Sequence, residues 1–157
     1  MVSRSDCLKR YGSDYYIRKK LAAGELFRVD KGIYSEKENV PELALIAYKY
    51  PNAVVTMETA YYLYDLTDEI PDEYSVATKR EAAPITDLRV KQYFVPKEIL
   101  RLGETVFDYK GYLIPIYDRE RMLVELVRYK PKLPYNYYKE ILRNYRRILP
   151  QLDAEKI

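Results

Sequence analysis

The side chains that could do chemistry in this chain are carboxylates, lysines and arginines. Its 157 residues include no histidine and a single cysteine, Cys7. Without histidine, a Ser-His-Asp or Cys-His site has no general base, and a zinc site of the usual type lacks its ligands. A lone cysteine also excludes an internal disulfide and is typical of the reducing cytoplasm, where we expect this protein.

One short pattern is compatible with a metal-dependent nuclease. Asp108-Tyr109-Lys110 has the D-x-K form, and Asp87 lies upstream as a second carboxylate. Such a site needs two carboxylates on adjacent strands to hold Mg²⁺ and a lysine to steady the developing charge. However, Lys110 precedes Gly111 at a predicted hairpin turn, which would point it to solvent. The sequence also has no glycine-rich phosphate-binding loop. We therefore expect no enzyme activity, no bound metal and no cofactor, and keep the nuclease as an alternative.

Basic residues gather at the two ends of the chain, although the net charge is only +3. Residues 1–34 carry eight basic and four acidic side chains, residues 35–127 carry eleven and seventeen, and residues 128–147 carry seven and one. Basic clusters are the electrostatic footprint of a polyanion such as a nucleic acid. A solvated surface of mixed charge is the alternative. The 19 tyrosines suit half-exposed positions and interfaces, although a composition bias would also produce them.

The N-terminal basic cluster falls on two predicted helices. Residues 3–11 favour a short helix that Gly12 ends. Ser13 then caps a second helix, which ends at Gly24. On this second helix, we expect Tyr16, Ile17 and Leu21 to face a core.

A small hairpin follows these helices. Residues 26–29 and 33–35 are two short strands around the Asp30-Lys31-Gly32 turn. Two helices and a hairpin in this order are typical of a winged helix-turn-helix, whose second helix enters the major groove of DNA. The alternative is an ordinary basic surface helix. The side chains that we expect to contact DNA are Tyr15, Arg18, Lys19, Lys20, Arg28 and Lys31.

The remainder of the chain predicts a small mixed α/β domain, with a boundary near residues 36–40. Apolar spacing and turn residues predict helices over 41–51, 57–66, 118–129 and 135–149, strands over 53–56, 73–78, 91–95, 105–109 and 112–117, and a helical turn over 96–102. On the last helix we expect Tyr138, Ile141, Leu142, Tyr145 and Leu149 to be buried and Arg143, Arg146 and Arg147 to be exposed. The predicted fold is therefore α+β, with a minimal winged helix-turn-helix over 1–35 and an α/β domain over 36–157. No stretch is long and apolar enough to predict a membrane span or a secretory signal.

Three segments together resemble the AbiE-type abortive-infection antitoxins. GELFRVDKGIYS (24–35) is similar to the G-x-L-x-R-x-x-x-G-x-Y pattern that closes their winged helix. Residues 50–80 resemble their next block, which contains an LTD-x-IP phrase and a strand ending in a basic pair. IPIYDRERMLVELVRYKPKL (114–133) resembles their Y-D-x-E-R-T-L-V-D block. The three segments occur in the family's order and, with their surroundings, cover residues 13–147.

The resemblance implies the antitoxin of a type IV toxin–antitoxin pair that aborts phage infection. The winged helix is expected to bind operator repeats and repress its own operon, with two copies on symmetric repeats. The second domain is expected to counteract a nucleotidyltransferase-like toxin, without a requirement for stable contact. Candidates for this antitoxin surface are Arg119, Arg121, Arg143, Arg146 and Arg147.

These arginines also have other interpretations. Arg119 and Arg121 could maintain the fold through capping and local ion pairs. Arg143, Arg146 and Arg147 could extend the DNA footprint, contact RNA, meet an acidic partner or form a solvated helix face. The sequence departs from the family pattern at Met122, where threonine is usual, and at Glu125, where aspartate is usual. It also begins with a shorter first helix, and we expect a further helical stretch after residue 157. A stand-alone transcription regulator and a protein-interaction module remain alternatives.

Overall fold

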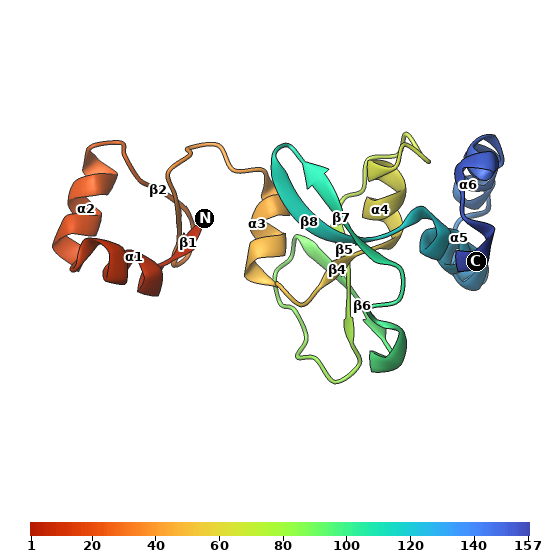
Figure 1. The fold of residues 1–157 in the computed structure, drawn as a ribbon, viewed down its shortest axis with the longest axis horizontal. Helices are drawn as coiled ribbons and strands as arrows, with labels where there is room; N and C mark the ends of the chain where they lie inside the picture. The colour runs from red at the N-terminus through yellow and green to blue at the C-terminus, as the bar shows by residue number, and fades with distance from the viewer. The chain divides into compact units, whose positions relative to one another are not determined.

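The computed structural model describes residues 1–157 and divides into two compact units, Met1–Lys49 and Tyr50–Ile157. We call them the N-terminal unit and the C-terminal unit. The division falls later in the chain than residue 35, the predicted end of the DNA-binding module, because the N-terminal unit also includes helix α3 (Glu42–Lys49). Helices and antiparallel strand pairs occur in both units (Figure 1), so the predicted α+β class is confirmed. None of the helices has the length and apolar character needed to cross a bilayer.

Two helices open the N-terminal unit, α1 (Arg4–Tyr11) and α2 (Asp14–Ala22). The side chain of Ser3 caps α1 by accepting a hydrogen bond from the Asp6 amide at 3.1 Å. Gly12 ends α1 with a left-handed φ of 87° and donates its amide to the Leu8 carbonyl. Ser13 occupies the N-cap position of α2, although its side chain makes no capping bond. The two predicted helices are thus confirmed.

The hairpin after α2 belongs to a sheet of three strands. Strands β2 (Phe27–Asp30) and β3 (Ile33–Ser35) form the predicted antiparallel hairpin, and Gly32 takes a φ of 71° in its turn. Strand β1 (Val2–Ser3) pairs with the other edge of β3, so the order is β1-β3-β2. The sequence did not predict β1, because two residues carry no detectable alternation.

The core beneath these elements is small, and its buried members are Cys7, Ile17, Leu26 and Tyr34. Ile17 therefore faces the core as predicted, and Leu21 packs against this cluster. The prediction for Tyr16 was wrong, since its side chain is 52% exposed. Ile17 and Leu21, four residues apart, already fill the narrow stripe that a nine-residue helix can bury.

The C-terminal unit is built on a mixed sheet of five strands. The strands lie in the order β6 (Val90–Val95), β5 (Tyr74–Lys79), β4 (Val54–Val55), β8 (Tyr112–Tyr117), β7 (Glu104–Tyr109). The central strand β4 pairs antiparallel with β5 and parallel with β8. Strand β6 pairs parallel with β5, and β7 pairs with β8 in the predicted hairpin.

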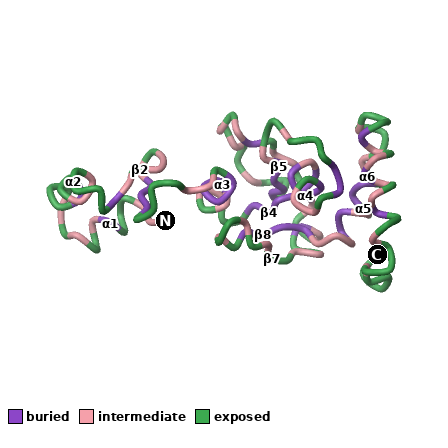
Figure 2. Tube along the Cα trace, turned by 90° about the horizontal axis from the view of Figure 1, so that it is seen from above, coloured by how far each residue is buried: buried purple, intermediate pink, exposed green.

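Three α-helices accompany this sheet, and α5 and α6 lie side by side (Figures 1 and 2). Asp118 caps α5 as predicted, with its carboxylate 2.8 Å from the Arg121 amide. The helices are α4 (Met57–Leu63), α5 (Arg119–Tyr129) and α6 (Tyr135–Ile148), and the 3₁₀ turns are η1 (Lys97–Ile99), η2 (Lys130–Lys132), η3 (Leu149–Gln151) and η4 (Ala154–Lys156).

Fully buried tyrosines link these elements. The hydroxyl of Tyr61 donates to the Met122 carbonyl at 3.0 Å, and that of Tyr145 donates to the Arg119 carbonyl at 2.8 Å. Burial raises the pKa of both phenols. Each ring adds apolar area to the core while its hydroxyl remains hydrogen-bonded, so these tyrosines fix α4 and α6 against α5.

Helix α6 buries Ile141 and Tyr145 as predicted, but the prediction was wrong for the other three residues. The buried stripe is Tyr137, Ile141 and Tyr145 at four-residue spacing, whereas Tyr138 and Leu142 are intermediate and Leu149 is 56% exposed. Because tyrosines occur at several positions of α6, helical spacing in the sequence allowed either side of the helix to be the buried one. The predicted exposure of the arginines of this helix is confirmed.

Gly103 provides a test of the packing around α5. It has a φ of 75°, and a Cβ built there would lie 2.7 Å from the Cβ of Arg121. We expect Gly103→Ala to lower the free energy of unfolding by about 2–5 kcal/mol, from left-handed backbone strain and overpacking. Urea denaturation measures this change.

Gly111→Ala is the matched control, because Gly111 has a φ of 87° and nothing within 4 Å of its added Cβ. Its expected cost is the backbone strain alone, about 1–2 kcal/mol. Equal losses in the two variants would contradict the tight packing of Gly103.

Candidate nucleic-acid interface

Helix α2 presents a polar, aromatic face to solvent. Tyr15 is 68% exposed and its ring lies edge-to-face with that of Tyr16, with 5.3 Å between the centroids. Arg18 and Lys19 are also exposed, and neither is within ion-pair distance of a carboxylate. Tyr16 was not among the predicted contacts, since it was expected in the core. Four neighbouring side chains of this helix are therefore available to a partner.

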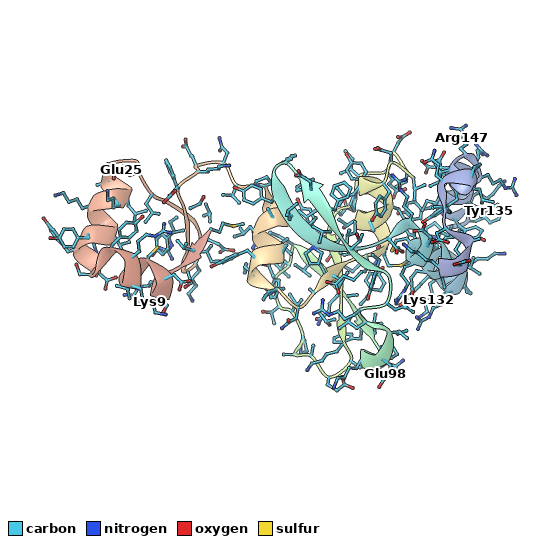
Figure 3. All side chains as sticks on the ribbon, viewed as in Figure 1. Lys9, Glu25, Glu98, Lys132, Tyr135 and Arg147 are labelled. Carbon is cyan, nitrogen blue, oxygen red and sulfur yellow. The ribbon has the colours of Figure 1, made fainter.

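Lys20 differs from the other predicted DNA contacts, because its ammonium pairs with the Glu25 carboxylate. The hydrogen bond from Lys20 to Glu25 raises the pKa of the lysine and partly neutralises its charge toward a partner. Glu25 lies just beyond the end of α2 (Figure 3), so the pair closes the last turn of the helix. The structure thus gives Lys20 an intramolecular role.

Some lysines and arginines of the N-terminal unit form ion pairs with carboxylates, and others have no acidic partner. Carboxylates hold cations in the pairs Arg4–Asp14, Arg10–Glu36, Lys20–Glu25 and Lys49–Asp30. The exposed cations without an ion pair are Lys9, Arg18, Lys19, Arg28 and Lys31. Arg28 lies on β2 and Lys31 in the hairpin turn, as predicted. The unit therefore keeps a positive potential on α2 and the hairpin.

The candidate antitoxin arginines do not share one surface. Arg143, Arg146 and Arg147 are exposed on α6 and form no ion pair. Arg119 is half-buried, with its guanidinium carbon 5.3 Å from the centroid of the Tyr64 ring.

The prediction that Arg121 belongs to the antitoxin surface was wrong, because its side chain is buried and only 6% of the residue is exposed. Its Nε donates to Glu125 at 2.9 Å, and its Nη1 donates to the carbonyls of Ile99 and Leu102 at 2.8 and 2.7 Å. The guanidinium carbon also lies 4.4 Å from the centroid of the Tyr117 ring. These contacts tie α5 to the turn after β6, so the residue maintains the fold, which was the alternative interpretation.

A cavity of about 610 Å³ lies beside this arginine. Apolar side chains line much of it, including Ile99, Leu102 and Val124. Charges of both signs also border it, so it has no dominant potential that would select an anion or a cation.

The residues of the nuclease alternative are not brought together. Asp87 precedes β6 and Asp108 lies on β7, and these strands are the two opposite edges of the sheet. The carboxylate of Asp108 accepts the Gly111 amide at 2.9 Å within the hairpin turn. Asp87 binds the Arg89 guanidinium at 2.6 Å. No group of three carboxylate or cysteine side chains in the chain is placed to hold a metal ion.

A polar network around Glu58 was missed by the sequence reasoning. Its carboxylate accepts hydrogen bonds from Ser75 at 2.9 Å, Lys91 at 2.8 Å and Tyr93 at 2.9 Å. Burial opposes ionisation of Glu58, but the hydrogen bonds from Lys91, Ser75 and Tyr93 outweigh it and hold the pKa below its usual value. The members are scattered over α4, β5 and β6, so no sequence motif could have revealed them.

Comparison with known proteins gave no match, either to a protein-family model or to a curated sequence. The resemblance to the AbiE-type antitoxins therefore stays a prediction from the three sequence segments.

The buried Arg121–Glu125 pair can be tested by breaking it from one side. Glu125→Leu would leave the guanidinium buried without its counter-ion, and we expect a loss of about 3–5 kcal/mol in the free energy of unfolding. Arg121→Met combined with Glu125→Leu should recover part of that loss, because no unpaired charge then remains. Chemical denaturation of each variant measures both effects.

The control is Glu104→Leu, which breaks the partly exposed Arg101–Glu104 pair of 2.8 Å. Its expected cost is below about 1 kcal/mol. A Glu125→Leu protein as stable as this control would show that the buried pair does not organise the unit.

Proposed function

We propose that this chain is the antitoxin of a type IV toxin–antitoxin pair of the AbiE type, which represses its own operon and counteracts a nucleotidyltransferase-like toxin. The proposal rests on the three segments that resemble these antitoxins, taken with the arrangement of the N-terminal unit. We place it in the cytoplasm, with two copies of the chain on symmetric operator repeats.

The N-terminal unit supports a winged helix-turn-helix as the DNA-binding module. Its order is β1-α1-α2-β2-β3-α3, and β1 adds to the hairpin to form one small sheet. In a winged helix-turn-helix, the second helix enters the major groove and the hairpin lies along the backbone. In this chain those elements are α2 and the β2–β3 hairpin.

The observation that carries the proposal is the exposed face of α2. Tyr15, Arg18 and Lys19 are exposed and unpaired, so binding DNA would break no ion pair of theirs. Arginine can bind guanine through two hydrogen bonds, whereas lysine and tyrosine contact phosphates. Arg28 and Lys31 of the hairpin are the proposed backbone contacts. We leave Lys20 out of this set because Glu25 holds it.

A stand-alone winged-helix regulator is the second candidate, because the features of α2 and the hairpin favour it equally. The gene next to this one separates the two functions. A neighbouring reading frame for a nucleotidyltransferase-like protein favours the antitoxin, and its absence favours the regulator.

Operator binding can be measured by fluorescence anisotropy on duplex DNA from upstream of the gene, with a scrambled duplex beside it. We expect specific binding that weakens steeply with salt. Arg18→Ala/Lys19→Ala should reduce the slope of log K against log salt by about 0.9, because Lys19 contacts a phosphate, and should narrow the preference for operator over scrambled DNA, because Arg18 contacts a base.

Lys97→Ala/Lys110→Ala is the matched control, since both lysines are exposed and unpaired but lie in the C-terminal unit. This variant should bind the operator like the unaltered protein. Equal binding to the operator and the scrambled duplex would remove the repressor role.

Toxin neutralisation is tested by co-expression with the neighbouring gene in cells whose growth that gene arrests. The unaltered chain should restore growth. Expression should be driven from an unrelated promoter, so that loss of repression in Arg18→Ala/Lys19→Ala does not affect toxin dose. Growth arrest despite normal levels of the folded chain would contradict the antitoxin role and leave the regulator.

A further inference from the structure

Helix α6 carries a set of cations that no carboxylate neutralises. Lys139, Arg143, Arg146 and Arg147 are all exposed, and none forms an ion pair. Glu140 is the one acidic residue between positions 128 and 147. Its carboxylate faces a loop, where it accepts hydrogen bonds from the Thr67 hydroxyl and the Asp68 amide, each at 3.1 Å. The positive potential of the helix is therefore directed to solvent.

These cations follow the helix axis in regular steps. Residues 139, 143 and 147 are four apart, so successive side chains advance by about 6 Å along one side of α6. Lys139, Arg143 and Arg146, with Leu142, also line a small hollow of about 130 Å³. A row of guanidinium and ammonium groups with a hollow between them suits a chain of phosphates rather than one isolated anion.

Exposed aromatic rings accompany the cations. Tyr135 begins α6, is 69% exposed, and has the Lys139 ammonium 5.1 Å from its ring centroid. Tyr138 has the Lys130 ammonium 5.4 Å from its ring centroid. Figure 3 shows Tyr135 and Arg147 along α6, with Lys132 on the neighbouring η2 turn. Tyrosine rings stack on bases, and the cations beside them can hold the connecting phosphates.

We propose that this α6 surface, formed by Tyr135, Lys139, Arg143, Arg146 and Arg147, binds single-stranded nucleic acid. Single strands offer unpaired base faces for stacking, whereas a duplex keeps its base faces inside the helix. An acidic protein would also complement the cations, and the polyglutamate peptide in the test below represents that outcome. The surface belongs to the C-terminal unit and is separate from operator binding, which we assign to α2, so neither proposal depends on the other.

The test uses the full chain and anisotropy of labelled 20-nucleotide strands, U20, dT20 and dU20, together with a duplex of mixed sequence and a polyglutamate peptide. We expect these single strands to bind more tightly than the duplex. Tighter binding of U20 than of both dT20 and dU20, which has the same base as U20, would identify RNA through its 2′-hydroxyl, and equal binding would identify single strands of either kind. Tyr135→Ala should weaken binding by about fivefold or more, and Tyr135→Phe should restore it, because stacking needs the ring and not the hydroxyl.

The charge requirement is tested with Arg143→Ala/Arg146→Ala, which should reduce the slope of log K against log salt by about 1.4 for a single strand. The control is again Lys97→Ala/Lys110→Ala, which should leave the slope unchanged. Arg18→Ala/Lys19→Ala should bind U20 normally even where it no longer binds operator DNA, so the two proposals fail independently. Circular dichroism establishes that each variant is folded.

Several results would overturn the proposal. One is duplex binding as tight as single-strand binding, and another is binding of polyglutamate but not of U20. Unchanged affinity in a folded Tyr135→Ala protein would exclude stacking on that ring. Loss of U20 binding in Arg18→Ala/Lys19→Ala would place the single strand on α2 instead.

Discussion

The buried guanidinium of Arg121 is the interaction on which much of the C-terminal unit depends. A buried charge must have a counter-ion and hydrogen-bond acceptors, so its position constrains every group around it. Glu125 supplies the counter-ion, the carbonyls of Ile99 and Leu102 accept two more hydrogen bonds, and Gly103 has no room for a side chain. One side chain thus joins α5 to the turn that follows β6.

In the N-terminal unit, ion pairing has a different consequence. Basic residues occur on both α1 and α2. Carboxylates hold Arg4, Arg10 and Lys20, whereas Arg18 and Lys19 remain unpaired. The distribution of acidic side chains therefore leaves most of the free positive charge on α2 and the hairpin, with Lys9 as the one unpaired cation of α1.

Tyrosine serves two purposes in this protein. The rings of Tyr61 and Tyr145 are fully buried, and their hydroxyls donate to main-chain carbonyls between helices. Tyr15 and Tyr135, in contrast, are more than two-thirds exposed beside cations on helices of the two units. The same side chain suits both settings because it combines a large apolar ring with one polar group.

Sequence alone determined the elements whose signals are local. The cap at Asp118, the end of α1 at Gly12 and the turn at Gly32 depend on neighbouring residues, and the structure contains all of them. Helical spacing also predicted correctly that Arg143, Arg146 and Arg147 of α6 are exposed.

Only the tertiary structure decided which tyrosines of a helix are buried and which charges are paired. Tyr16 and Tyr137 could each have faced either way by spacing, and neighbouring elements settled their burial. The sequence allowed Arg121 either a surface role or a structural one, because two of its acceptors, the carbonyls of Ile99 and Leu102, are about twenty residues away. Long-range packing and ion pairing leave no periodic trace in a sequence, and for that physical reason they required the fold.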